Sequence, residues 1–305
     1  MKKFLVNVTK FFALFILVLT IIESYLYYYP SSFRYKYTFL QNNNNNIEVL
    51  VLGSSHNHRA INPEFITDFV TSNLAFDRQD LTMDYYLLTT YIDHLPKLKY
   101  VVLNITYDTL ESKLGSDDFK NSLYLRFHGI NNFNRRLNPK DYSMFLQRPK
   151  YYLLNFFPFL NHTKINVYGA VTNTGKDDFL PTQNGILSDK NSTVIPHHAN
   201  ENPAHYDNNV IVLKNLLTLC KKHNLTPVLI TPPVTASHFN AMIPEKRQRR
   251  DAMIPHLLEL FPHAQYFNFE TDTRFTVSDF MDSSHLNPRG AEKFSSILNS
   301  ILGTL

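Results

Sequence analysis

Residues 47–58 read IEVLVLGSSHNH, and this stretch decides how the rest of the chain is interpreted. Five of the six residues at 47–52 are apolar, and they are mostly β-branched or Leu, which predicts a buried strand of a parallel sheet. Gly53 follows and permits a sharp turn, so Ser54 and Ser55 would emerge at the carboxyl end of the strand, where open α/β sheets carry their sites. A serine in this position is a candidate nucleophile, although Gly-Ser-Ser is also an ordinary turn and helix cap.

A second polar motif follows much later in the chain. Residues 282–291 read DSSHLNPRGA, which sets Asp282 three residues before His285 and just ahead of the last predicted helix. Together with a serine after the first strand, this pair indicates an acyl-transfer triad. His285 would take the proton from Ser55, and Asp282 would orient the imidazole and stabilise its charged form. Each residue also has a structural explanation, since aspartates commonly cap helices and most histidines are structural.

The rest of the chain alternates strands and helices. Further strands are predicted at residues 72–76, 98–105, 227–231 and 265–269, and helices at about 63, 85–92, 210–224 and 244–261. This alternation predicts an α/β fold whose central parallel sheet is covered on both faces. Residues 112–205 interrupt the rhythm, and a long insertion beside a site often builds a lid or a substrate groove.

The N-terminal region is predicted to be a membrane anchor. Residues 5–29 are predominantly apolar and long enough to span a bilayer as a helix. Because no small-x-small cleavage motif precedes the tyrosine-rich end, we favour a retained anchor at residues 1–30 over a cleaved signal peptide. The lysines near the N-terminus predict that this end lies in the cytoplasm and that the domain at residues 47–305 is extracytoplasmic. Residues 31–46, which contain a run of asparagines, are predicted to be a linker.

Composition excludes several classes of protein. The chain has 305 residues, of which 44% are hydrophobic, so it can bury a sizeable core. Its net charge is +4 with scattered basic residues, which gives no nucleic-acid footprint. Cys220 is the only cysteine, which excludes an intrachain disulfide and a cysteine-based metal site, and its helical surroundings predict a buried apolar position. We predict no cofactor and no metal, although His56 and His58 with Asp282 are the ligands that a metal-dependent hydrolase would use.

The two motifs together resemble the SGNH/GDSL hydrolase superfamily, whose first block is Gly-x-Ser after the first strand and whose last block is Asp-x-x-His before the final helix. Residues 53–55 and 282–285 match these blocks in type and order. The resemblance covers residues 47–305 and looks closest to the membrane-anchored branch that decorates cell-envelope glycopolymers, including the alginate acetylation proteins and the teichoic acid D-alanylation protein. It implies a three-layer flavodoxin-like fold with a sheet of about five strands, and it favours Ser55 over Ser54 as the nucleophile.

The middle blocks of the superfamily match poorly. In the family, a glycine of the second block and an asparagine of the third block bind the oxyanion; the corresponding positions here are Ala75 or Arg78, and Asn104. The resemblance therefore implies Arg78, Gln79 and Asn104 as oxyanion-binding or substrate-binding residues, with Arg78 acting through its backbone N–H or its guanidinium. Asn104 also has a structural alternative, which is to point into the core or to satisfy a neighbouring backbone group.

The fate of an acyl-serine intermediate separates two activities. Release to water would make the protein an esterase, and release to a sugar hydroxyl would make it an O-acyltransferase. The expected substrate is an extracytoplasmic glycan or envelope polymer, and a transferase would need an integral-membrane partner that exports the acyl group. The poor middle blocks leave open a different class, a glycan-binding or scaffolding subunit without catalysis.

Overall fold

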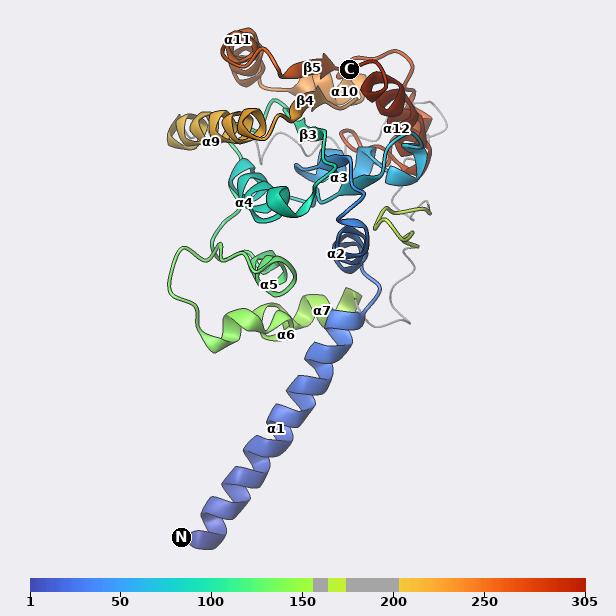
Figure 1. The fold of residues 1–305 in the computed structure, drawn as a ribbon. Coiled ribbons are helices and arrows are strands. Elements are labelled where there is room, and N and C mark those ends of the chain that lie inside the picture. The colour runs from blue at the N-terminus through green and yellow to red at the C-terminus, as the bar shows by residue number, and fades with distance from the viewer. Residues whose placement is uncertain (156–163, 174–202) are drawn as a thin grey trace. The chain divides into compact units, whose positions relative to one another are not determined.

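A computed structural model describes residues 1–155, 164–173 and 203–305 of the chain. The chain divides into two compact units (Figure 1). The first comprises Met1–Arg34 and Ser116–His162, and the second comprises Tyr35–Gly115 and Thr163–Leu305. The described part of the first unit is helical, and the second unit contains a sheet with helices around it.

The second unit is built on a five-stranded sheet. Its strands are β1 (Val49–Val51), β2 (Thr71–Asn73), β3 (Tyr100–Asn104), β4 (Thr226–Thr231) and β5 (Gln265–Asn268). They lie in the order β2-β1-β3-β4-β5, and every neighbouring pair is parallel. The predicted parallel α/β fold is therefore confirmed, with strand ends that differ by at most three residues. This order reverses the direction of winding between β1 and β3, and the carboxyl ends of those two strands are where doubly wound sheets bind ligands.

Helices lie on both faces of this sheet (Figure 1). The helices of the unit are α2 (Ser32–Asn43), α3 (Ser55–Ala60), α4 (Leu81–Tyr91), α9 (Pro203–Lys222), α10 (Ala236–Ala241), α11 (Pro244–Leu260) and α12 (Pro288–Leu302), with 3-10 turns η1 (Pro63–Phe65), η2 (Ile92–His94) and η6 (Val277–Asp279). α3 and α12 share one apolar core with Val49, Val51 and Val102 of the sheet. α4 and α9 pack together on the other side.

The predicted helices are present, with one difference in type. Proline at the first position and a cap by Asn62, which accepts a hydrogen bond from the Glu64 N–H, start only the 3-10 turn η1. Asp80 caps α4 by accepting a hydrogen bond from the Met83 N–H. Cys220 lies on α9 and is fully buried, as predicted.

The segment predicted to be a linker, residues 31–46, contains a helix. Most of the segment is helix α2, and its Lys36 and Leu40 are buried in the second unit. The asparagine run led to the linker prediction because polar low-complexity segments commonly serve as tethers between folded parts. Here Phe33, Lys36 and Leu40 are buried at the three- and four-residue spacing of one helix face, and their burial stabilises the helix.

The predicted insertion separates β3 from β4. Its described helical part consists of α5 (Lys120–Leu123), the π-type turn η3 (Tyr124–His128), the 3-10 turn η4 (Pro139–Tyr142), α6 (Met144–Gln147) and α7 (Pro149–Asn155). These elements belong to the first unit together with α1 (Lys2–Tyr28). The rest of the insertion at residues 156–163 and 174–202 lies outside the described residues.

α1 is the one helix of the described residues that is long and apolar enough to cross a membrane. It has 27 residues, and most of its large apolar side chains are exposed. Both properties agree with the predicted anchor.

Candidate active site

The turn after β1 places two serines at the start of α3. Gly53 has a positive φ of 118°, and a Cβ at this position would overlap Oδ1 of Asn104. Glycine is therefore required both for the backbone conformation and for the close approach of Asn104. Ser54 is the extended residue that precedes α3, and Ser55 is its first helical residue.

Ser55, His285 and Asp282 form a continuous chain of polar contacts. The Oγ of Ser55 lies 2.8 Å from Nε2 of His285, although the two residues are 230 positions apart. The other ring nitrogen, Nδ1, lies 2.8 Å from Oδ2 and 3.0 Å from Oδ1 of Asp282. Because an ionised carboxylate only accepts, Nδ1 carries the proton, and Nε2 of the neutral ring is left to accept from the Ser55 hydroxyl.

Asp282 is held in its ionised form. Backbone N–H groups of Ser284 and His285 donate to its Oδ1, each at 2.9 Å. Burial alone would raise the pKa of this carboxyl, but the hydrogen bond and charge of His285 and the two backbone donors outweigh burial and hold the pKa of Asp282 well below its ordinary value. A carboxylate in this state can orient the imidazole and stabilise it when it becomes charged.

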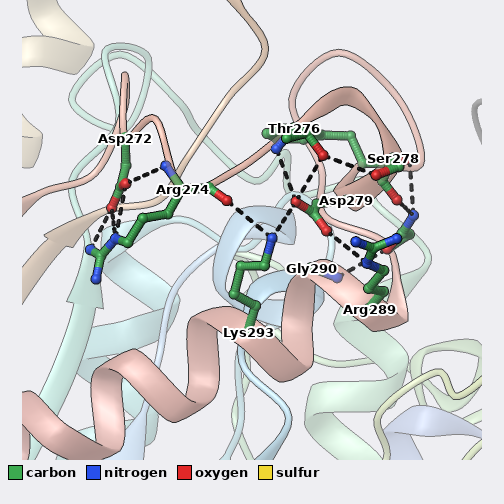
Figure 2. A network of polar contacts seen from close by, with 10 residues as sticks. Asp272, Arg274, Thr276, Ser278, Asp279, Arg289, Gly290 and Lys293 are labelled. Atoms are coloured by element: carbon green, nitrogen blue, oxygen red, sulfur yellow. Dashed lines mark hydrogen bonds and ion pairs between the residues drawn. The ribbon is translucent and has the colours of Figure 1, made fainter.

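A buried carboxylate holds the loop that carries Asp282 and His285. This loop lies between β5 and α12, and the side chain of Asp279 within it is fully buried. Figure 2 shows its contacts with Thr276, Arg289 and Lys293. Asp279 accepts hydrogen bonds from the Thr276 N–H at 2.9 Å and from Nζ of Lys293 on α12 at 2.6 Å. Burial alone would raise the pKa of Asp279, but the contacts with Lys293 and the Thr276 N–H have the larger effect. The pKa is therefore below its ordinary value, and the carboxylate stays charged.

The same loop packs closely on the first turn of α12. The backbone carbonyl of Asp279 accepts from the Asn287 N–H at 3.0 Å, and a Cβ on Gly290 would overlap this carbonyl oxygen. The sequence analysis missed Asp279 and Gly290 as positioning residues. The available signal was the Thr-x-x-Asp spacing of a capping box before the motif, which the structure contains as Thr276 and Asp279.

Arg78 occupies the backbone conformation that a glycine would favour. Its φ is 62°, in the left-handed region, and its side chain is exposed. The resemblance gives Ala75 or Arg78 as the counterpart of the second-block glycine, and of these two residues Arg78 has the positive φ. Its role in binding an oxyanion stays a prediction.

Gln79 and Asp84 hold the backbone of the turn at Gly53 through hydrogen bonds. The amide Nε2 of Gln79 donates to Oδ1 of Asp84 at 2.6 Å, and the same oxygen accepts from the Gly53 N–H at 2.8 Å. Burial, with a smaller contribution from the charge of Asp80, raises the pKa of Asp84 to about 7. These contacts favour a positioning role for Gln79 over direct contact with substrate.

Asn104 contacts Ser54 and has little capacity left for a substrate. Its Oδ1 accepts from the Ser54 N–H at 2.7 Å, and its Nδ2 donates to the Ser54 Oγ at 3.1 Å and to the Thr109 Oγ1 at 3.4 Å. This is the structural alternative that the sequence analysis left open. Ser54 lies 3.4 Å from Nδ1 of His56, whereas Ser55 contacts His285, so the geometry distinguishes the two serines.

His56 and His58 contact different residues. The ring of His56 lies beside that of His285, with centroids 5.1 Å apart, and burial followed by the charge of His285 lowers the pKa of His56 to about 3. His58 is buried and contacts Lys36. Within the described ranges, no group of three or more His, Cys, Asp or Glu side chains is arranged to hold a metal ion.

The side chain of Lys36 contacts three other segments, which are α3, β2 and the loop after β2. Its Nζ lies 2.7 Å from Nδ1 of His58, 2.6 Å from the carbonyl oxygen of Ala75 and 3.3 Å from Oδ1 of Asn73. An ammonium has three protons, and these three acceptors take them all. Burial lowers the pKa of Lys36 well below its ordinary value, and burial together with Lys36 does the same to the pKa of His58. The sequence analysis missed Lys36 because it lies in the predicted linker.

No protein-family model matches this chain, and no curated protein matches its sequence. Solved structures with some likeness include a protein from Streptococcus pneumonia provisionally described as a platelet activating factor, with 12% identity, a TM-score of 0.43, and coverage of 88% of this chain and 91% of that one. A protein from Bacteroides fragilis provisionally described as an acylhydrolase has 9% identity, a TM-score of 0.42, and coverage of 87% and 95%. A GDSL-like lipase from Bacteroides thetaiotaomicron has 10% identity, a TM-score of 0.41, and coverage of 88% and 98%.

Proposed function

We propose that this protein is a membrane-anchored, serine-dependent carbohydrate esterase or O-acyltransferase that acts on an extracytoplasmic glycan or envelope polymer. The observation that carries the proposal is the chain of contacts from Ser55 through His285 to Asp282, with 2.8 Å at each step. These distances fall within hydrogen-bond reach of about 2.6–3.2 Å, which is what a nucleophile, its base and the orienting acid require.

The reaction begins with attack of Ser55 Oγ on the carbonyl carbon of an ester. The hydroxyl proton passes to Nε2 of His285, and the resulting imidazolium is stabilised by Asp282. The same proton is then given to the departing alkoxide, which leaves as an alcohol and yields an acyl-serine. Water or a sugar hydroxyl attacks this intermediate with His285 again as the base, which restores Ser55 and releases an acid or an acylated sugar.

The negative oxygen of each tetrahedral intermediate needs hydrogen-bond donors. Ser55 lies at the first position of α3, where the backbone N–H groups have no hydrogen-bond acceptor within the helix. In the proposal the Ser55 N–H and the Arg78 N–H supply the oxyanion hole. The guanidinium of Arg78 is exposed and would add positive charge.

The membrane part of the proposal follows from α1 and its flanking lysines. α1 is retained as a single-pass anchor with its N-terminus in the cytoplasm, and the α/β unit is extracytoplasmic. An O-acyltransferase on that side requires an integral-membrane partner that delivers the acyl group.

A non-catalytic glycan-binding or scaffolding subunit is the alternative. The observation that favours it is the side chain of Asn104, whose oxygen and nitrogen both contact Ser54. An oxyanion hole without this amide has fewer donors, and the loss of one donor typically lowers the rate by about 10²–10³-fold.

The test is mass spectrometry of the full chain in detergent after incubation with a fluorophosphonate or with p-nitrophenyl acetate. We expect an adduct on Ser55 that is absent from the His285→Ala variant and present in Ser54→Ala, which serves as the matched control. Absence of any adduct from the wild-type chain would favour the non-catalytic alternative. Reaction in ¹⁸O-labelled water with a sugar acceptor present separates the two activities, because hydrolysis puts the label into the released acid and transfer yields an acylated sugar without it.

A further inference from the structure

The C-terminal end of α1 is held by the helices of the first unit. The carboxylate of Glu23 accepts hydrogen bonds from the Ser143 Oγ at 2.6 Å, the Phe145 N–H at 2.9 Å and the Met144 N–H at 3.1 Å. One turn further along α1, the ring of Tyr27 stacks on Phe127, with centroids 5.0 Å apart and planes 6° from parallel. The segment 116–155 therefore has a fixed position along the axis of α1.

This position corresponds to the surface of a bilayer if α1 spans it as proposed. A helix rises 1.5 Å per residue and a hydrocarbon core takes about 20 residues, so a span that begins near Leu5 ends at about residue 25. Lys10 lies near enough to the N-terminal side for its long side chain to reach the headgroups there. Tyr25 and Tyr28 are exposed at the other end, as expected of aromatic residues at an interface. Glu23 lies about 3 Å before this end, so the residues that contact it lie at the boundary between the hydrocarbon core and the headgroups.

α6 and α7 have the orientation of helices that rest on a membrane. Both lie across the end of α1 instead of extending along it (Figure 1). α7 buries Tyr152, which is 2% exposed, but exposes Leu153 and Leu154 at 45% and 54%. An exposed apolar pair beside the end of a membrane-spanning helix fits the boundary between headgroups and acyl chains.

The charge of this segment has the sign that an anionic surface attracts. Residues 116–155 contain seven Lys and Arg and three Asp. Their net charge of +4 equals the net charge of the whole chain. Six of the basic side chains are exposed: Arg126, Arg135, Arg136, Lys140, Arg148 and Lys150. Of the acids, Asp141 is buried and contacts Arg135 at 2.7 Å. The exposed charge of the segment is therefore mainly positive.

We propose that residues 116–155 form a platform that binds the headgroup layer of an anionic bilayer around the end of α1. Leu153 and Leu154 enter the acyl-chain boundary, and the exposed lysines and arginines contact lipid phosphates. The inference rests on the membrane span of the proposed function but not on its catalytic part. The platform gives the protein a second, lipid-sensitive contact besides the span itself.

The test measures the membrane depth of single labelled cysteines in the full chain. On a Cys220→Ser background, a nitrobenzoxadiazole probe is attached to Leu154→Cys on the platform, to Leu14→Cys on α1, or to Leu260→Cys on α11 as an exposed control. Each protein is reconstituted into phosphatidylcholine vesicles with and without phosphatidylglycerol, and quenching by lipids with a doxyl group near the headgroup or near the chain end is recorded. We expect headgroup-level quenching at residue 154 that is stronger with phosphatidylglycerol, deep quenching at residue 14, and none at residue 260.

A charge-reversal pair isolates the electrostatic part of the contact. Lys140→Glu with Lys150→Glu is expected to remove the dependence of quenching at residue 154 on phosphatidylglycerol. The matched change, Lys221→Glu with Lys222→Glu on α9, should leave it unchanged. Deep quenching at residue 14 without quenching at residue 154 would overturn the platform and point to a protein partner on α7, whereas absence of quenching at residue 14 would overturn the span itself. Neither result bears on the reactivity of Ser55, which the adduct experiment measures separately.

Discussion

Lys36 of α2 contacts Nδ1 of His58 on α3 at 2.7 Å, and both side chains are buried. His58 lies three positions after Ser55 on the same helix. Through Lys36, the helix that carries the candidate nucleophile is joined to α2 and to Ala75, which precedes the predicted oxyanion residue Arg78.

Replacing Lys36 with Met is expected to destabilise the α/β unit. The variant keeps most of the side-chain volume but leaves the buried carbonyl of Ala75 and Nδ1 of His58 without this donor, and each such loss costs roughly 1–3 kcal/mol. Urea unfolding of the full chain in detergent, followed by circular dichroism, measures the change. Lys99→Met is the control, because Lys99 is exposed and solvent-exposed ion pairs such as its contact with Glu48 contribute little to stability. Equal stability of the two variants would contradict a structural role for Lys36.

The sequence was sufficient for the sheet and for the three residues of the candidate triad. Buried strands are local signals, since runs such as residues 98–105 are apolar enough to be recognised without their neighbours. Ser55, Asp282 and His285 could be paired because their motifs follow a strand and precede a helix, which brings them to one edge of the sheet.

The supporting contacts could not be predicted because they depend on several segments at once. Burial of Lys36 is tolerated only because acceptors from β2, the loop after it and α3 all converge on one ammonium. The side chain of Asn104 had two possible directions, and the choice depends on the path of the backbone at Ser54. Neither fact is visible in the spacing of the residues along the chain.

Asp84→Asn is expected to remove a pH-dependent loss of stability. The pKa of Asp84 is raised from an ordinary 3.8 to about 7. Between these values the folded chain binds more protons than the unfolded chain, so the contribution of Asp84 to stability falls as the pH rises from 4 to 7 and is constant above that. The amide can still accept from the Gly53 N–H, so the variant should gain a few kcal/mol over the wild type at pH 8 and little at pH 4.

Urea unfolding of both proteins at several pH values tests this sign. Subtraction of the two curves of unfolding free energy against pH cancels the contributions of the other titrating groups. One of these is Asp282, whose lowered pKa makes stability fall as the pH falls. A difference that does not change between pH 4 and pH 8 would show that Asp84 has an ordinary pKa.

Gly290→Ala is expected to disturb the loop that carries the acid and the base. The added Cβ would meet the carbonyl oxygen of Asp279, a backbone atom that cannot move without shifting the loop. We expect a loss of stability of about 1–3 kcal/mol and slower labelling of Ser55 by fluorophosphonate. Gly303→Ala is the control, because its Cβ would lie 3.6 Å from the nearest atoms at the end of α12. Unchanged labelling in Gly290→Ala would mean that Asp282 and His285 do not depend on this packing.

Asp282→Asn tests the catalytic proposal most directly. The amide has nearly the same shape, but its NH₂ group can donate to Nδ1 of His285 and so favour the tautomer with the proton on Nε2. That nitrogen then cannot accept the proton of Ser55, from which it lies 2.8 Å away. Acylation of Ser55 should fall by about 10³–10⁴-fold, as a misplaced tautomer does in a serine triad.

Rapid-quench mass spectrometry of p-nitrophenyl acetate labelling gives the acylation rate, and Ser284→Ala controls for the neighbouring hydroxyl that lies 3.2 Å from Nδ1 of His285. Loss of activity only in Asp282→Asn would assign the orienting role to the carboxylate. Equal rates in wild type and Asp282→Asn would show that His285 takes its correct tautomer without Asp282, and the contact between them would then be structural.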